Sequence, residues 1–338
     1  MFCLEARRGT FSTGTPLAPR VAHLARDALV MSSGPLRDEG PTGGFRVRDA
    51  LAAGVPRSRL TRRDLTAPVH GVRSRKGVPM TTVEAIALVL RDDQFISHVT
   101  AARLWGAPLP GPFDDELVHV SSMGVAPVMR RPQVAPHRSR SQGFEVDHVR
   151  GIPVSPPARA WFECASLVGE TDLVVLGDYF VGPSALATTD ALRAAIVPGS
   201  RSARKARSAL DRVRCGVESP METRFRLGVI DAGFPEPDVN VDVVDEAGVF
   251  LGRADLAWPQ HRIALEYDGD HHRERRTFQH DQRRSNGFVV NGWIVIHATA
   301  ADAGRPAVLV ERLRQAFAQR RIEQARRARR DARMSTLA

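Results

Sequence analysis

Acidic side chains near the C-terminal end of this 338-residue chain are spaced so that they could hold a divalent metal ion. Asp255 and Glu266 lie near the ends of two consecutive segments expected to pair as a hairpin, which could bring both carboxylates to one edge of a sheet. Two carboxylates at one place repel each other, and Mg²⁺ is commonly held by one or two protein carboxylates with water and substrate phosphates. We therefore expect Asp255 and Glu266 to bind Mg²⁺ (or Mn²⁺).

The residues that follow Glu266 could supply acid–base chemistry. Gly269 permits a sharp turn at the strand end, which would place Asp268 and the pair His271 and His272 beside the metal. A histidine has a pKa near neutrality and could act as the general base on an attacking water. Arg284, on a following helix, could bind the scissile phosphate through a bidentate pair.

The surrounding segments predict the elements that position these residues. Ser219 and Glu222 form the pattern of a capping box, so a helix is expected to begin at Pro220 and to end at Gly233. The order αβββαβα that follows predicts an α/β sandwich with a mixed sheet. We expect its strands at 240–244, 249–257, 262–267 and 293–297, and its later helices at about 275–286 and 306–320.

The same residues, in this order, resemble a known nuclease domain over about residues 216–320. The motifs that carry the resemblance are Asp255, Glu266-x-Asp268-Gly269, a following histidine, Asp281-x-x-Arg284 and Gly292-Trp293. They look like the nuclease-like domain of unknown function related to the very-short-patch mismatch repair endonuclease, within the PD-(D/E)XK superfamily. The resemblance implies a restriction-endonuclease-like αβββαβ core and a divalent-metal-dependent DNA endonuclease that hydrolyses phosphodiester bonds.

The resemblance also implies a role for individual positions. Asp255 would be the metal ligand of the first half-motif, although Ala254 stands in place of the proline. Glu266 would be the second metal ligand. Glu222 would be the acidic residue of the first helix.

One position departs from the superfamily pattern. The usual lysine would fall at Asp268, and no lysine follows Lys205 anywhere in the chain. The mismatch repair endonuclease also lacks that lysine and uses histidines instead. The resemblance therefore implies that His271 or His272 takes its place here.

Residues 43–78 are expected to form a second nucleic-acid-binding part. Helix, tight turn, basic helix and hairpin is the order of a winged helix-turn-helix. The expected second helix, 56–63, carries Arg57, Arg59, Arg62 and Arg63, which could bind DNA; alternatively, it is a packing module with a solvated basic face. The layout resembles a set of actinobacterial proteins whose N-terminal domain is similar to that of abortive-infection antitoxins.

The rest of the chain predicts an organisation without further chemistry. Residues 1–42 read as a disordered leader, 80–215 as an α+β middle domain with a basic linker at 201–214, and 321–338 as a basic tail. His98 and His119 each stand alone in the middle domain, and we expect them to be structural residues.

Composition restricts the partners and the compartment. The net charge of +10 favours a polyanion such as DNA, although 46 of the 48 basic residues are arginine, which a GC-rich genome alone can produce. Three distant cysteines predict neither a disulfide framework nor a zinc knuckle, which fits a cytoplasmic protein. No run of apolar residues is long enough to span a membrane, and no motif for an organic cofactor is present.

Each residue of the proposed site also has a simpler interpretation. These alternatives are a helix cap for Glu222, an ion pair with Arg253 or Arg262 for Asp255, an ordinary turn at Asp268-Gly269, half of a transition-metal site for His271 and His272, and a surface pair for Asp281 and Arg284. At the level of function, the alternative is a DNA-binding regulator or antitoxin-like protein with an inactive nuclease fold. An RNA substrate also stays open.

Overall fold

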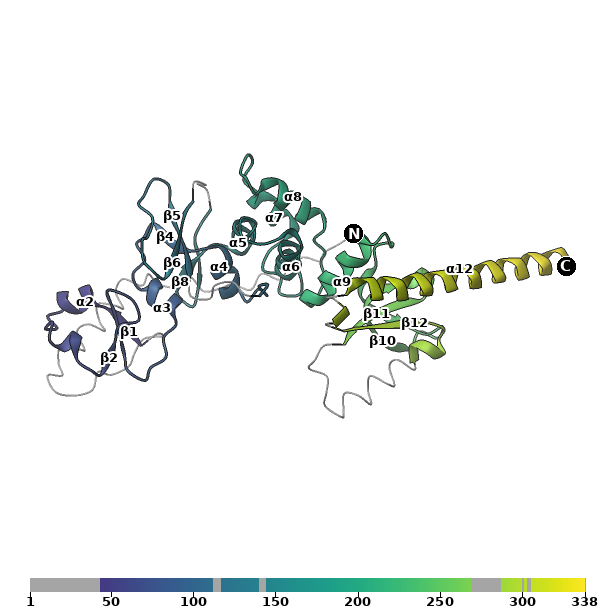
Figure 1. Cartoon of the computed structure of the whole chain (residues 1–338), viewed down its shortest axis with the longest axis horizontal. Coiled ribbons are helices and arrows are strands. Elements are labelled where there is room, and N and C mark those ends of the chain that lie inside the picture. The colour runs from purple at the N-terminus through teal and green to yellow at the C-terminus, as the bar shows by residue number, and fades with distance from the viewer. Residues whose placement is uncertain are drawn as a thin grey trace. The chain divides into compact units, whose positions relative to one another are not determined.

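The computed structural model describes residues 43–111, 117–139, 144–268, 287–299, 301–302 and 305–337. The chain divides into two compact units (Figure 1). The first unit runs up to Leu176 and includes Ala187–Ser208, and the second consists of Gly177–Leu186 and the chain from Ala209 onward. The predicted leader, 1–42, lies outside the described residues, as do His271, His272 and Arg284.

A small antiparallel sheet opens the first unit. Its strands β1 (Gly44–Arg46), β3 (Val72–Arg75) and β2 (Leu65–Thr66) lie in that order, and α2 (Val47–Ala52) follows β1. Val69 and Val72 belong to the same apolar core as the five-stranded sheet that follows in the chain.

The basic helix predicted at 56–63 is wrong, because only the single 3-10 turn η1 (Arg59–Thr61) forms. The guanidinium of Arg73 donates to the Leu60 carbonyl at 2.8 Å, so this carbonyl is taken by a side chain. The guanidinium of Arg59 forms a bidentate pair with Asp64, at 2.7 and 3.0 Å, which closes the turn before β2.

The larger part of the first unit is a mixed sheet in the strand order β6-β5-β4-β8-β7. The strands are β4 (Gln94–Ile96), β5 (Val118–Met123), β6 (Val134–Ser139), β7 (Asp147–Val149) and β8 (Ile152–Val154). The helices are α3 (Thr82–Ala87), α4 (His98–Leu104), α5 (Pro157–Cys164), α6 (Glu170–Val181), α7 (Thr189–Ala195) and α8 (Ala203–Asp211), of which α6 and α8 continue into the second unit.

Two elements of this region depart from the sequence-based expectation. β6 forms around Pro136, where the sequence indicates no strand, because an edge strand tolerates a proline, whose missing N–H breaks no central ladder. α8 forms within the expected linker, where its buried residues Ala206 and Ala209 give it an apolar side. The α+β character expected for 80–215 is confirmed, because helices α3 to α7 accompany the sheet.

The second unit is built on a four-stranded sheet in the order β12-β11-β10-β9. β9 (Asp238–Val244), β10 (Phe250–Trp258) and β11 (Ile263–Asp268) form an antiparallel meander, and β12 (Ile294–Thr299) pairs parallel to β11. A 3-10 turn, η2 (Pro259–His261), joins β10 to β11. The mixed α/β character predicted for this region is confirmed, and the helix expected at about 275–286 lies outside the described residues.

Helices α9 (Pro220–Asp231) and α12 (Pro306–Leu337) contribute to the core of this unit. Phe225 of α9 and Leu313 of α12 pack with Leu256 and Leu265 of the sheet. α12 then continues as one long helix (Figure 1), so the predicted basic tail is an exposed arginine-rich helix as far as its side chains are described. No helix in the described part of the chain combines the length and apolarity needed to cross a membrane.

A buried ion pair anchors α9 within the second unit. Arg226 is fully buried and donates to the carboxylate of Asp178 at 2.8 Å, and Thr223 donates to the same oxygen. Asp178 also accepts the backbone N–H of Arg214 at 2.7 Å. Burial raises the pKa of Asp178 even though Arg226 opposes the shift, so desolvation is the larger influence on this carboxyl.

Breaking this pair should destabilise the second unit strongly. Asp178→Ala leaves the buried Arg226 with only the half-exposed Glu236, 3.7 Å away, as an ion partner, and we expect it to lower the free energy of unfolding by about 3 kcal/mol. Hydrogen exchange on peptides from α9 and β10, followed by mass spectrometry, measures the loss. Asp231→Ala, which removes a largely exposed partner of Arg212, is the control and should change exchange far less. Equal exchange in both variants would contradict the anchoring role.

Candidate functional site

Four polar side chains occupy one register row across the sheet of the second unit. The register pairs Glu266 with His297 directly. On the antiparallel side, Leu256 pairs with Leu265, so the next position across these two strands holds Asp255 and Glu266. The pairs on either side of Asn240 in β9 place Asn240 opposite Asp255. We call Asn240, Asp255, Glu266 and His297 the polar row; neighbours in such a row lie on one face of a sheet and within contact distance.

Asp255 lies where strands β10 and β11 stop pairing. The backbone N–H of Tyr267 donates to the Asp255 carboxylate at 2.7 Å, beyond the last ladder pair Leu256–Leu265. Glu266 is almost completely buried, with 2% of its surface exposed, whereas Asp255 is half-buried. The sheet therefore places the two carboxylates at one position on neighbouring strands, and it buries Glu266, which the sequence did not predict.

Helix α9 brings a third carboxylate, Glu222, to the same place. Its Oε2 accepts the Asn240 side-chain amide at 2.8 Å and the backbone N–H of Glu218 at 2.9 Å. Burial raises the pKa of Glu222, these hydrogen bonds oppose the rise, and the nearby Asp255 charge adds to it. Asn240, which lies opposite Asp255 in the register, therefore links Glu222 of α9 to the sheet.

A histidine that was not among the predicted site residues completes the row. His297 on β12 lies beside Glu266 in the register, and its Nδ1 is 3.2 Å from the Asp268 carboxylate. Both side chains are about half exposed, so they are open to solvent. The sequence signal was present: His297 ends the predicted strand 293–297, which a parallel neighbour of β11 would bring to this position.

The structure also bears on the simpler interpretations. Ser219 accepts the Glu222 N–H and caps α9, but the Glu222 carboxylate accepts from Glu218, so the predicted reciprocal capping box is wrong in its second half. Arg253 forms ion pairs with Glu218 and Asp242, and Arg262 with Glu246. These arginines are therefore engaged with other carboxylates.

Within the described ranges, His98, His119 and His137 form the one group of three or more His, Cys, Asp or Glu side chains with ligand atoms all within 4.8 Å of one another. The carboxylates of the polar row do not form such a group. The expectation that His98 and His119 each stand alone is wrong, because the strand β6, absent from the prediction, carries His137 to them.

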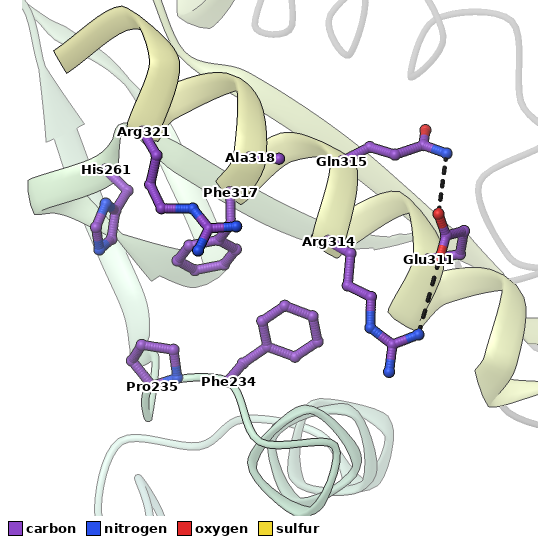
Figure 2. A pocket seen from close by; sticks show the side chains of 9 residues that line it. All are labelled: Phe234, Pro235, His261, Glu311, Arg314, Gln315, Phe317, Ala318 and Arg321. Carbon is purple, nitrogen blue, oxygen red and sulfur yellow. Dashed lines mark hydrogen bonds and ion pairs between the residues drawn. The ribbon is translucent and has the colours of Figure 1, made fainter. Parts of the chain in front are cut away.

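An open pocket lies beside α12 (Figure 2). His261, Phe234 and Phe317 line its apolar side, and Arg314 and Arg321 of α12 lie around it. Glu311 in its wall is engaged by Gln315 and Arg314, at 3.3 and 3.7 Å. None of the polar-row residues lines this pocket, so it contributes nothing to the carboxylate site.

The predicted DNA-binding arginines differ in their surroundings. Arg57, Arg62 and Arg63 are exposed on the turn around η1. Arg59, in contrast, is committed to Asp64. Three of the four predicted side chains therefore present a positive charge to solvent, and one stabilises the turn.

Two proteins of Mycobacterium tuberculosis are similar to this chain, one from strain CDC 1551 / Oshkosh and one from strain ATCC 25618 / H37Rv. Each is 29% identical over 239 residues, which covers 63% of this chain and 78% of the relative, and each is named only as an uncharacterized protein. No family model matches the chain, and no solved structure matches it significantly. These relatives supply no activity that could be transferred to this chain.

The raised pKa of Glu222 predicts a pH dependence of stability. The folded state keeps the Glu222 proton to a higher pH than the unfolded chain does. The contribution of this proton to the free energy of unfolding is therefore complete below the ordinary pKa of 4.5 and is lost as the pH rises through the pKa of the folded state. Glu222→Gln should therefore show a smaller decline of stability above pH 4.5 than the wild type, measured by denaturant titration across pH. Glu246→Gln, at a side chain that is 90% exposed, is the control; a wild-type slope in Glu222→Gln would contradict the burial effect.

Proposed function

We propose that the chain is a divalent-metal-dependent DNA endonuclease and that the polar row is its catalytic site. The observation that supports this most directly is the succession of Asp255, Glu266 and His297 across three neighbouring strands. Burying a carboxylate is costly unless positive charge or hydrogen bonds compensate it. A bound cation between Asp255 and Glu266 would supply that compensation.

The order of elements supports a PD-(D/E)XK core for the second unit. α9 precedes the meander β9, β10 and β11, and the parallel strand β12 and helix α12 follow. We propose that this unit has the αβββαβ core of the very-short-patch-repair-like nucleases, with the helix between β11 and β12 falling outside the described residues.

The donor set fits a hard divalent cation. Asp255 and Glu266 would hold Mg²⁺ or Mn²⁺, which prefer carboxylate oxygens and often take only one or two from the protein. When bound, such an ion lowers the pKa of a bound water and neutralises developing charge on the phosphate. Asn240 and the Glu218 N–H fix the orientation of Glu222 beside Asp255.

His297 is a candidate for the general base that the missing lysine would otherwise provide. The Asp268 carboxylate, 3.2 Å from its Nδ1, would hold the imidazole in one tautomer and leave Nε2 to take a proton from the attacking water. His271 and His272 remain candidates for the same role, and Arg284 for binding the scissile phosphate.

Positive charge on both units supports a nucleic-acid substrate. The chain carries a net charge of +10, and exposed arginines occur around η1 and along the C-terminal half of α12. The strand order β1-β3-β2 with α2 supports the wing of a winged helix-turn-helix in the first unit, with the turn η1 in place of the second helix. We propose that these surfaces bind DNA phosphates.

The catalytic proposal predicts metal-dependent nicking of plasmid DNA that depends on the polar row. Asp255→Asn and Glu266→Gln should each lower the nicking rate with Mg²⁺ or Mn²⁺ by at least about 100-fold, because a catalytic metal contributes several kcal/mol and each 1.4 kcal/mol is about tenfold. The rate of conversion of supercoiled to open-circular plasmid measures this effect.

Asp242→Asn is the matched control, because Asp242 is an exposed carboxylate on β9 beside the row. It should leave the nicking rate within about twofold of the wild type, since it removes a surface charge only. Equal nicking by the wild type, Asp255→Asn and Glu266→Gln would contradict the catalytic proposal.

A DNA-binding regulator or antitoxin-like protein with an inactive nuclease fold is the second candidate function. The absence of any lysine after Lys205 favours it, because the superfamily uses a lysine beside the second metal ligand. Calorimetric titration of the protein–DNA complex with Mn²⁺ distinguishes the two functions. Binding that Glu266→Gln abolishes favours the nuclease, and the absence of binding favours the regulator.

The exposed arginines around η1 should control DNA affinity through salt-dependent binding of phosphates. The triple variant Arg57→Ala, Arg62→Ala, Arg63→Ala should weaken binding of any duplex sequence and reduce the salt slope of log K by about 0.9 for each phosphate that the variant no longer neutralises. Fluorescence anisotropy with labelled duplex at several salt concentrations measures both. Arg193→Ala, at an exposed arginine of α7, is the control; an unchanged slope in the triple variant would exclude this DNA surface.

A further inference from the structure

Three histidines from three elements meet in the first unit. His98 is the first residue of α4, His119 lies on β5, and His137 lies on the edge strand β6. β5 and β6 are parallel neighbours, and His119 and His137 stand two register positions apart on them. We call these three residues the histidine cluster; it belongs to a different unit from the polar row.

The ring nitrogens of the histidine cluster are close enough for one ion. Each histidine offers a nitrogen within 4.8 Å of those of the other two, and Nδ1 of His119 is 2.9 Å from Nε2 of His137. Zn–N bonds of about 2.0–2.1 Å in a tetrahedral site set the ligand nitrogens about 3.3 Å apart. The 2.9 Å distance and the 4.8 Å upper limit are compatible with this value, so the three nitrogens are near enough to share an ion.

The rings as described are stacked rather than convergent. The ring centroids of His98 and His137 are 3.7 Å apart, with 23° between the planes. An imidazole lone pair lies in the plane of its ring, so stacked rings do not aim their lone pairs at one point. Binding of an ion therefore requires at least one ring to turn. We expect the stacking of His98 on His137 to be lost when the ion binds.

A buried network holds His98 in an unusual backbone conformation. His98 has φ +53, in the left-handed region that a non-glycine residue seldom adopts. Its N–H donates to the buried Glu163 carboxylate at 3.1 Å, and Ser155 and Arg159 donate to the same carboxylate at 2.7 and 2.9 Å. Strained backbone of this kind gathers at functional sites.

A hydroxyl pair fixes the His98 ring. Nδ1 of His98 is 2.9 Å from the Ser97 Oγ, which accepts a hydrogen bond from the Ser121 hydroxyl at 2.8 Å. Metal-binding histidines commonly use one ring nitrogen for such a partner and leave the other for the ion. Nε2 of His98 is the nitrogen left for a ligand.

The histidine cluster combines one buried ring, that of His98, with two that reach the surface. His119 and His137 are only half-buried, so an ion can enter from solvent.

We propose that His98, His119 and His137 bind a divalent transition-metal ion, with Zn²⁺ as the preferred ion and solvent in the fourth position. Three neutral nitrogen donors suit Zn²⁺ and related ions and offer little to Mg²⁺, which prefers oxygen. Glu163 is engaged by Arg159, Ser155 and the His98 N–H, which leaves the fourth ligand to water. Three protein ligands with an open fourth position is the arrangement of catalytic rather than structural zinc.

Zinc titration of the full chain tests this proposal. The protein is first stripped with a chelator and then titrated with Zn²⁺ in a calorimeter, in the background Asp255→Asn, Glu266→Gln so that the polar row contributes no carboxylates. We expect one equivalent to bind at the histidine cluster. His137→Gln and His119→Gln should each weaken this binding by more than about 100-fold, and Ser97→Ala by about 10–100-fold, as a positioning residue would.

His148→Gln is the matched control, because His148 is an exposed histidine on β7 of the same unit. It should bind Zn²⁺ like the background protein. Unchanged binding in folded His137→Gln, or no zinc binding by the background protein, would overturn the proposal. Circular dichroism establishes that each variant is folded.

If His119→Gln and His137→Gln do not fold, the zinc site can be tested by spectroscopy on the protein with the histidine cluster intact. The zinc K-edge X-ray absorption spectrum of the 1:1 complex reports the ligands directly. We expect about three imidazoles and one oxygen ligand at tetrahedral distances. A spectrum dominated by oxygen ligands would place the ion elsewhere and overturn the proposal.

Discussion

Charge compensation at the polar row is the constraint on which the second unit depends. Glu266 is only 2% exposed and lies beside Asp255, so the fold holds two neighbouring carboxylates where water cannot fully solvate both. The Tyr267 N–H donates a hydrogen bond to the Asp255 carboxylate, and the Asn240 side-chain amide donates one to the Glu222 carboxylate. The Asp178–Arg226 pair in turn fixes the helix that carries Glu222. Under our proposal, a cation between Asp255 and Glu266 would compensate the charge that these hydrogen bonds leave.

The two clusters differ in the chemistry that their donors favour. The polar row presents carboxylate oxygens, which suit hard ions that activate water on a phosphate. The histidine cluster presents neutral nitrogens held by a strained backbone and a buried carboxylate, which suit a borderline ion. Under our proposals, each unit would hold its own type of metal, and the two sites can be loaded or emptied separately.

The sequence predicted what depends on local pattern and missed what depends on distant pairing. Turn residues at 245–248 and 258–261 bound the strands that carry Asp255 and Glu266, and Ser219-Pro220 marks the start of α9, so these elements and their acids could be placed. The helix predicted at 56–63 is replaced by a single 3-10 turn, whose Leu60 carbonyl accepts from Arg73, a residue 13 positions away in the chain. The histidine cluster was missed because Pro136 argues against a strand at β6, which carries His137. His297 was missed because it meets Glu266 only through the parallel pairing of β12 with β11, which joins strands distant in sequence.

The most direct test of the central claim is the position of manganese in crystals of the protein grown with Mn²⁺, located by anomalous scattering at the manganese edge. We expect a peak bonded to carboxylate oxygens of both Asp255 and Glu266. A map in which manganese is absent from these residues, or binds only at other surface carboxylates, would contradict the polar row as a metal-dependent catalytic site.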